Sequence, residues 1–304
     1  MHTLHHRDGH HGWDRSLLPR SEIAPGDVVE MVLADCFGGQ LGPDAVPADV
    51  TALDLALANP LTGPVFVHGV EPGDVLAVEI LDLEPGGTGW TAVIPGFGLL
   101  ADVFPHPHVV VSQIADGVVR FGDVARLPAR PFLGTIGVAP AADGPHSVIP
   151  PRNVGGNLDC RDIGVGATLL LPVEVPGALL SVGDPHAAQG DGEVCGTAVE
   201  TTARVRLRVG VRRGPRLAAP QIESPAGTSS AAGRRLMTTG VGPDLYAGGR
   251  EATLAMVERL GADHGLAPSD AYALCSVAAH LRILEVVDAP NWVVGLDLDL
   301  GVLG

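Results

Sequence analysis

Two stretches of this chain, "APGDVVEMVLAD" at residues 24–35 and "EPGDVLAVEILDL" at residues 71–83, begin with the same turn and then alternate. Proline fixes φ at the second turn position and glycine accepts a positive φ at the third. Each Pro-Gly-Asp therefore predicts a type II turn that leads into a strand. The similarity of the two stretches predicts two related β units.

Further alternating runs follow these two strands and are separated by clusters of glycine and proline; among them are "HVVVSQI", "GVVRFGD", "GATLLLPVEV", "EVCGTAVETTARVRLRV" and "NWVVGLDLDLGV". The chain has 41 glycines and 26 prolines in 304 residues, which favours short strands and many turns over long helices. We expect a mainly β fold, a sandwich or barrel-like body of two similar β units with a small C-terminal helical pair.

Helical periodicity is confined to residues 244–288. In the second predicted helix Ser269 can cap the start, and apolar side chains recur on one face at Leu274, Val277, Leu281 and Leu284. A shorter helix precedes it and stops near Gly265. The pattern places His280 in the middle of the second helix.

We expect three units along the chain. Residues 1–135 form an N-terminal β unit, and residues 136–235 form a second β unit that carries an acidic loop. Residues 236–304 form the helical pair and a final strand that packs on the β body. The stretch 214–240 is rich in glycine, proline, alanine and serine and predicts a long connection.

The charge balance disfavours several partners. The chain has 35 acidic and 19 basic residues, a formal charge of -16, which repels nucleic acids and anionic membrane surfaces. No run of about 18 apolar residues predicts a membrane span, and the polar start does not resemble a signal peptide. The four cysteines lie far apart, which predicts reduced thiols and a cytoplasmic protein.

The strongest candidate for chemistry is "SVGDPHAAQGDGEV" at residues 181–194, which contains Asp184, His186, Gln189, Asp191 and Glu193. A mixed set of imidazole and carboxylates suits zinc or another first-row divalent ion, whereas calcium loops use oxygen ligands alone. A solvated hairpin explains the same residues equally well at this point.

Two other segments offer polar groups next to glycines. In "GGNLDCRDIG", residues 155–164, Asn157 and Asp159 can point to one face if the segment is extended, although an Asx turn also accounts for them. In "LADCFGGQLG", Asp35 ends a strand, where it can bind a ligand or begin a turn. Cys195 is a candidate nucleophile, although a structural cysteine is the more common role.

Several quoted segments, in chain order, resemble the acetamidase/formamidase family. They include "NPLTGPVFVHGVEPGDVLAVEI", "PGFGLLADVF", "RPFLGTIGVAP", the paired G-N-x-D and G-D-x-H-x-x-Q-G-D-G-E motifs, and "DAYALCSVAAHLRI". The similarity runs from about residue 11 to the end. The "GLLADVF" segment departs from many relatives, which carry a small polar turn there.

This resemblance implies hydrolysis of the C–N bond of a small amide with release of ammonia, a divalent metal, zinc rather than calcium, and a homo-oligomer, a dimer or larger. Acetamidases, formamidases and enzymes acting on a γ-lactam belong to the family, so the substrate does not follow from the motif. The positions that match its motifs are Asp35, Asn157, Asp159, Asp184, His186, Gln189, Asp191 and Glu193.

All 19 basic residues are arginines, which excludes two amidase classes that need lysine, the Ser-Ser-Lys and the Glu-Lys-Cys types. A metal-activated water with a carboxylate base remains the expected chemistry, since no G-x-S-x-G elbow is present.

Specific roles follow as hypotheses. We expect the ion to be held by His186 and Asp159 with Asp35 or Asp184, leaving one position open. Glu193 would carry the proton. The remaining predicted roles are contact with the substrate amide for Gln189 and Asn157, and orientation of His186 for Asp191. A γ-lactam hydrolase and a noncatalytic metal-stabilised binding module remain as alternatives.

Overall fold

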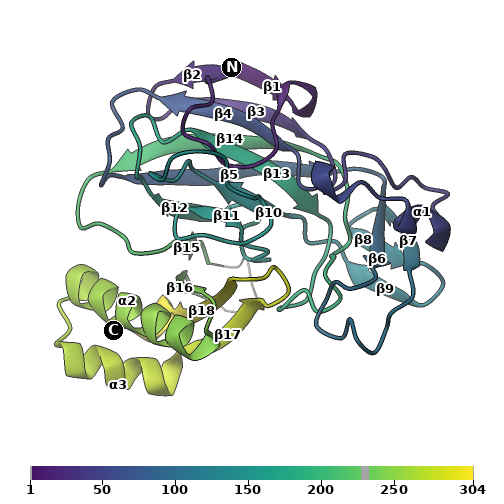
Figure 1. Ribbon diagram of the computed structural model, residues 1–304. Coiled ribbons are helices and arrows are strands. Elements are labelled where there is room, and N and C mark those ends of the chain that lie inside the picture. The colour runs from purple at the N-terminus through teal and green to yellow at the C-terminus, as the bar shows by residue number, and fades with distance from the viewer. Residues whose placement is uncertain (1, 227–232, 304) are drawn as a thin grey trace.

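The computed structural model describes residues 2–226 and 233–303, which form three sheets (Figure 1). The largest has nine strands in the order β1 (His2–His5), β3 (Val28–Leu33), β14 (Ala203–Arg212), β5 (Val75–Pro85), β12 (Thr168–Pro172), β15 (Gln221–Ser224), β16 (Arg235–Gly242), β18 (Trp292–Asp299) and β17 (His280–Glu285). A five-stranded sheet has the order β11 (Gly155–Asn157), β10 (Phe132–Gly137), β13 (Leu180–His186), β4 (Leu61–Val67) and β2 (Ser21–Ile23). A four-stranded sheet contains β6 (Thr88–Val93), β7 (His108–Ala115), β8 (Val118–Phe121) and β9 (Ala125–Pro128). The prediction of a mainly β fold is confirmed.

The two Pro-Gly-Asp turns are formed as predicted. Gly26 and Gly73 have φ values of +99° and +98°, and each turn is closed by a hydrogen bond from its aspartate N–H to the first turn carbonyl, 3.1 and 3.0 Å long. The strands that follow, β3 and β5, both pair antiparallel with β14, one on each side. The repeated sequence therefore places two related strands around one central strand.

The main hydrophobic core lies between the nine-stranded and five-stranded sheets. It joins Val78 and Leu207 of the large sheet to Ile136 and Val182 of the smaller one, all four fully buried. The strands in this part of the chain are apolar on the face that meets the other sheet, which makes the two sheets a sandwich.

The helices differ in part from the prediction. Helix α2 (Leu245–His264) is capped by the side chain of Asp244 and ends at Gly265, which is left-handed, so the predicted stop is confirmed. Helix α3 (Pro268–Ala278) starts with proline in its first turn after Ala267, and Ser269 is not its cap. A short helix, α1 (Pro47–Thr51), lies outside the predicted helical range, and three 3₁₀ turns span His6–Asp8, Leu55–Leu57 and Leu300–Val302.

The predicted continuation of the second helix to Leu284 is wrong. The chain leaves the helix at Ala278, and residues from His280 onward form β17, with Leu281 opposite Leu296 and Ile283 opposite Val294 of β18. Backbone pairing with β18 outweighs the local helical spacing, because the same apolar residues also fit a strand that covers one edge of the sheet. His280 is therefore in a strand and not in a helix.

The predicted long connection at residues 214–240 is also wrong in part. It contains all of β15 and most of β16, which pair with each other in the large sheet, while residues 227–232 lie outside the described ranges. That sheet takes strands from all three predicted units, and the unit boundaries stay predictions. Helices α2 and α3 pack on the end of the sheet formed by β16 and β18. None of the described helices is long and apolar enough to cross a membrane.

Candidate active site

Strand β10 brings the two polar sequence motifs together. It lies between β11 and β13, and its Thr135 is opposite Asn157 of β11 on one side and Gly183 of β13 on the other. The G-N-x-D motif at the end of β11 and the G-D-x-H motif in β13 therefore meet across a single strand, at the edge of the five-stranded sheet.

His186 is the centre of this arrangement and is fully buried. Its Nε2 lies 3.1 Å from Asp184 Oδ1 and 3.2 Å from Glu200 Oε2. On the other side its Nδ1 lies 2.9 Å from Gln189 Oε1 and 3.8 Å from Asp159 Oδ1. Burial alone would lower the pKa of His186, but the carboxylates of Glu200 and Asp184 outweigh it and raise that pKa well above its usual range.

Asp159 faces His186 without a conventional hydrogen-bond partner. Its side chain is 1% exposed, and neither carboxylate oxygen receives a hydrogen bond from an N–H or hydroxyl group of the described residues. Burial and the charge of Asp184 raise the pKa of Asp159 to about 6. Gly134 makes room for the pair, since a Cβ there would lie 2.6 Å from both Asp159 Oδ1 and His186 Cε1. Two unpartnered buried oxygens call for a cation or a proton.

Glu193 completes a group of potential metal ligands. One of its carboxylate oxygens, an oxygen of Asp159 and a ring nitrogen of His186 all lie within 4.8 Å of one another. Glu193 also lines an open cleft of about 1320 Å³, which Asp159 and His186 do not reach. Burial, and then the charge of Asp159, raises the pKa of Glu193 well above its usual range. Glu193 thus lies between the buried group and the cleft.

Asn157 is engaged in a network of buried side chains. Its Oδ1 accepts hydrogen bonds from the Thr135 hydroxyl and from Asn59 Nδ2, the latter at 2.9 Å, and its Nδ2 donates to Asp288 Oδ2 at 2.7 Å. None of these bonds goes to its own backbone, so the Asx-turn interpretation does not describe it. These hydrogen bonds hold both the oxygen and the nitrogen of the Asn157 side-chain amide.

Gln189 takes the position that the sequence analysis gave to Asp191. In addition to its contact with His186, its Nε2 donates a 2.7 Å hydrogen bond to the backbone oxygen of Asp159. Asp191 instead accepts two hydrogen bonds from Arg282, at 2.9 and 2.7 Å, and lies 3.0 Å from Arg161. The side chain that can orient His186 is therefore Gln189.

Asp191 belongs to a separate set of ion pairs, here called the arginine network. Arg282 also lies 2.8 Å from Asp162 and 3.1 Å from Asp297, and Arg235 forms a second ion pair with Asp297. The network joins the loop of residues 189–194 to strands β16, β17 and β18 and lines the same cleft as Glu193. Its members are Arg161, Arg235, Arg282, Asp162, Asp191 and Asp297.

Asp35, the fourth predicted metal ligand, shapes a turn. Its Oδ1 accepts hydrogen bonds from the backbone N–H groups of Phe37 and Gly39, at 2.9 and 3.0 Å. Burial raises the pKa of Asp35, and the charge of Asp184 adds to the effect. It lies close to the site, but its described contacts are those of a turn residue, and its role as a ligand stays a prediction.

Seven buried carboxyl groups gather around His186 and have no arginine ion pair among the described residues. We call them the acidic cluster: Asp35, Asp159, Asp184, Glu193, Glu200, Glu285 and Asp288. Burial is the main cause that raises the pKa of Glu200 to about 7 and that of Glu285 to about 8. Asp184 is the exception, because His186 outweighs the effect of burial and lowers its pKa.

The backbone at the site is unusual. Seven described residues other than glycine have a clearly positive φ, and four of them are site residues: Asn59 (46°), Asp159 (42°), Asp184 (52°) and Glu193 (47°). Asparagine and aspartate adopt this region at low cost, but glutamate does so rarely. Such strain is typical of functional sites, where the surrounding structure holds a side chain in one direction.

The sequence analysis missed several residues of the site: Cys36, Asn59, Thr135, Glu200, Glu285 and Asp288. Glu200 and Asn59 lie in segments that carry the family resemblance, which was the signal that could have found them. Glu285 and Asp288 were hidden by the helix predicted over that stretch. They reach the site because Gly192 forms a β-bridge with Glu285 and donates a hydrogen bond to the Leu284 carbonyl.

The donor set of Asp159, His186 and Glu193 fits a divalent metal ion. It offers one nitrogen and two oxygen ligands from buried side chains, and the unpartnered oxygens of Asp159 need a positive partner. The contacts of His186 Nε2 with the carboxylates of Asp184 and Glu200 are of the kind that commonly orient a metal-binding imidazole.

Comparison with known sequences gives a consistent result. A profile described as the Acetamidase/Formamidase family matches residues 2–148 and 141–303. The acetamidase of Mycolicibacterium smegmatis is 31% identical over 271 residues, which cover 68% of this chain and 66% of that protein. The formamidase of Methylophilus methylotrophus is 30% identical over 260 residues, which cover 66% of this chain and 63% of that protein. The chain thus matches slightly less than two thirds of the length of these relatives.

Solved structures match along almost the whole chain. A predicted acetamidase/formamidase from Thermoanaerobacter tengcongensis has a TM-score of 0.90 and 31% identity, covering 99% of this chain and 96% of that one. A gamma lactamase from Delftia acidovorans is more distant, with a TM-score of 0.69 and 25% identity over 98% of this chain and 90% of that one.

Proposed function

This chain belongs to the acetamidase/formamidase family, and on that basis we propose that it hydrolyses the C–N bond of a small aliphatic amide, of the acetamide or formamide type, to a carboxylate and ammonia. The observation that carries the proposal is the pair of unpartnered oxygens of Asp159, which face His186 and Glu193 beside the cleft. The substrate class follows the acetamidase and the formamidase to which the chain is similar.

The positions of the site residues suggest which of them bind the ion and which orient those ligands. Asp159 and His186 would hold the ion, and Gln189 lies against both of them: its Oε1 is 2.9 Å from His186 Nδ1, and its Nε2 donates to the Asp159 backbone oxygen. When bound, a divalent ion supplies Lewis acidity, which polarises an amide carbonyl and makes water more acidic. We assign zinc, because a mixed imidazole and carboxylate set favours it over calcium.

Glu193 moves the proton in this proposal. As a carboxylate it accepts one proton from the water that attacks the amide carbon. As a carboxylic acid it then donates that proton to the amide nitrogen while the C–N bond breaks, so that ammonia leaves and the acyl group becomes a carboxylic acid. The acid then loses its own proton to solvent or to the ammonia and leaves as a carboxylate. Burial raises the pKa of Glu193, which favours the protonated form that donates to the leaving nitrogen.

The test is ammonia release from formamide, acetamide and a γ-lactam by the purified chain, together with metal content. We expect turnover of the linear amides, metal loss in His186→Ala, and retained metal with lost turnover in Glu193→Gln. Glu258→Gln, an exposed glutamate on α2, is the matched control and should behave as the parent. Turnover of the γ-lactam alone would overturn the substrate class, and metal loss in Glu193→Gln would overturn the proton-carrier role.

The proposal extends to assembly and location. We expect a homo-oligomer, because Leu99, Leu100, Val103 and Phe104 form a run of apolar side chains that are more than half exposed. We place the protein in the cytoplasm, where its four free cysteines would stay reduced. Sedimentation of the purified chain tests the first point: a single-chain mass at micromolar concentration would overturn it.

A further inference from the structure

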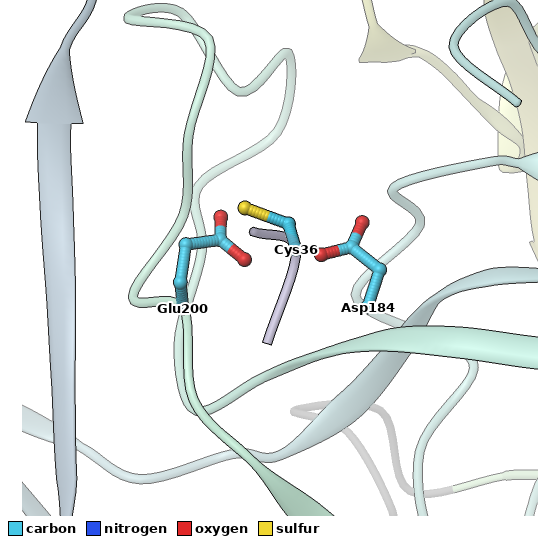
Figure 2. Close-up of side chains that lie close together, drawn as sticks. All are labelled: Cys36, Asp184 and Glu200. Carbon is cyan, nitrogen blue, oxygen red and sulfur yellow. The ribbon is translucent and has the colours of Figure 1, made fainter. Parts of the chain in front are cut away.

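A second group of potential metal ligands lies on the opposite side of His186 from Asp159. Cys36 follows strand β3, Asp184 is in β13, and Glu200 precedes β14; Figure 2 shows the carboxylates of Asp184 and Glu200 pointing toward Cys36. The sulfur of Cys36 and one oxygen of each carboxylate lie within 4.8 Å of one another. All three side chains are buried, at 7%, 3% and 1% exposure.

One oxygen of this group lacks a partner. Glu200 Oε1 accepts a hydrogen bond from the Ala198 N–H at 2.7 Å, whereas Oε2 receives none from the described residues. Glu200 Oε2 lies 3.2 Å from His186 Nε2, which is also 3.1 Å from Asp184 Oδ1, so two carboxylates face a single ring nitrogen that carries at most one hydrogen. A buried carboxylate oxygen that points into a group of sulfur and oxygen ligands indicates a missing positive charge.

The charges of the acidic cluster also call for more than one ion. With His186 neutral as a ligand, one divalent ion supplies two positive charges against seven carboxyl groups, none of which has an arginine ion pair in the described residues. Protonation can neutralise some carboxyl groups. Protonation of the carboxyl groups does not explain why a sulfur and two carboxylate oxygens converge at Cys36, whereas a bound cation does.

We propose that Cys36, Asp184 and Glu200 bind a second divalent ion, zinc or a similar first-row ion that accepts thiolate, next to the ion assigned to Asp159 and His186. The thiolate selects this class of ion over magnesium and calcium, which prefer oxygen ligands. Binding replaces the proton on Cys36 Sγ, which is released to solvent. His186 lies between the two groups of ligands, with Nδ1 on the side of Asp159 and Nε2 on the side of Asp184 and Glu200. This inference concerns the metal sites and does not depend on turnover of an amide.

Titration of the chelator-treated chain with Co²⁺ tests the second site, because cobalt bound by a thiolate has a strong charge-transfer absorption in the near ultraviolet. We expect two Co²⁺ per parent chain with this absorption. Cys36→Ala should bind one Co²⁺ and lack the absorption, and Asp159→Asn should keep the absorption with one Co²⁺. Cys275→Ala, a buried cysteine on α3 far from the site in sequence and packing, is the control and should match the parent.

Glu200→Gln keeps the thiol and the shape of the site, and reports on the same ion if Cys36→Ala does not fold; we expect it to lose one Co²⁺. Two bound ions in both Cys36→Ala and Glu200→Gln would overturn the second site. A parent chain that binds one Co²⁺, which Asp159→Asn removes and Cys36→Ala leaves, would also overturn it while leaving the proposed function intact. Absence of any bound Co²⁺ in the parent would remove the metal from both proposals.

Discussion

Two neighbouring regions of this molecule collect acidic side chains and differ in how the charges are compensated. In the arginine network, Asp191 and Asp297 each contact two arginines, and the groups line an open cleft. In the acidic cluster every carboxyl group is buried, a single histidine lies at the centre, and none has an arginine ion pair within the described ranges.

The difference shows which acidic residues belong to a candidate metal site. Arg282 at 2.7 Å and Arg161 at 3.0 Å already compensate the charge of Asp191, so Asp191 has little need of a metal ion. Asp159 and Glu200 have unpartnered oxygens at 1% exposure, which is costly unless a cation or proton is present. Four experiments can break or sharpen this contrast, beginning with the largest expected effect.

Metal removal should affect the acidic cluster most strongly. Dialysis of the parent chain against a strong chelator should reduce amide turnover about 10⁴-fold, since Lewis-acid activation is worth several kcal/mol, here about 5 kcal/mol. Readdition of Zn²⁺ should restore it, while Ca²⁺ should not. Full turnover at less than one-tenth of an equivalent of any metal would show that the cluster works without an ion.

Loss of an arginine should destabilise the arginine network. Arg282→Met keeps the aliphatic stem but leaves Asp297, which is 1% exposed, with fewer positive partners, and should lower the free energy of unfolding by about 3 kcal/mol. The matched change is Asp288→Asn, which removes one charge from the acidic cluster and leaves an oxygen for Asn157 to donate to. It should leave the metal-free chain unchanged or more stable.

Urea unfolding of both variants without metal measures the change in the free energy of unfolding. The comparison holds if the slope of that free energy with urea concentration is the same in both variants and in the parent. If Asp288→Asn destabilises the metal-free chain as much as Arg282→Met does, the charges of the acidic cluster are already compensated. The two regions then do not differ in this respect.

The pH dependence of stability should have a characteristic sign in the metal-free chain. Burial raises the pKa of Glu200 to about 7 and of Glu285 to about 8, above the value of about 4.3 in an unfolded chain. Between these limits the folded chain holds more protons than the unfolded chain. Its free energy of unfolding should therefore fall as the pH rises from about 4.5 to about 8, by up to about 1.4 kcal/mol per pH unit for each group.

Zn²⁺ should reverse this slope, because deprotonated carboxylates and a neutral imidazole are the ligands. Thermal or urea unfolding at several pH values, with chelator or with Zn²⁺, makes the comparison. A metal-free chain that gains stability from pH 5 to pH 8 would contradict the assignment of raised pKa values to the cluster.

The sequence predicted the parts of this arrangement that depend on local pattern. The turns at Gly26 and Gly73 follow from proline and glycine chemistry, and the mainly β fold follows from alternation. The sequence analysis assigned Asn157 and His186 to the same site, and β10 is the strand that connects their two motifs. These features need only short-range information or a motif that keeps its order along the chain.

The rest depends on contacts between distant segments. Nothing local to Asp191 distinguishes a carboxylate that binds arginine from one that binds an ion, because Arg282 is 91 residues away. Glu285 and Asp288 enter the site because β17 pairs with β18, in place of the helix that the spacing of Leu281 and Leu284 predicted, and because Gly192 bridges to Glu285. One misassigned element therefore removed two carboxyl groups from the predicted site.

The smallest effect is expected at Gln189, where the sequence and the structure suggest different roles. A residue that fixes metal ligands typically contributes 10-fold to 100-fold in metal affinity or activity, about 1.4 to 2.7 kcal/mol. Gln189→Ala should therefore weaken Zn²⁺ binding by about 10-fold to 100-fold. At saturating Zn²⁺ it should lower kcat with little change in KM, because the contacts of Gln189 go to His186 and Asp159.

Gln113→Ala, an exposed glutamine on β7, controls for removal of an amide side chain and should leave both constants unchanged. If Gln189 instead binds the substrate amide, as the sequence suggested, Gln189→Ala will raise KM and leave Zn²⁺ affinity intact. That result would separate Gln189 from the acidic cluster and return it to the cleft, beside the arginine network, since the side chain lines the cleft as well. Comparing the change in Zn²⁺ affinity with the change in KM thus shows whether Gln189 acts with the acidic cluster or with the cleft beside the arginine network.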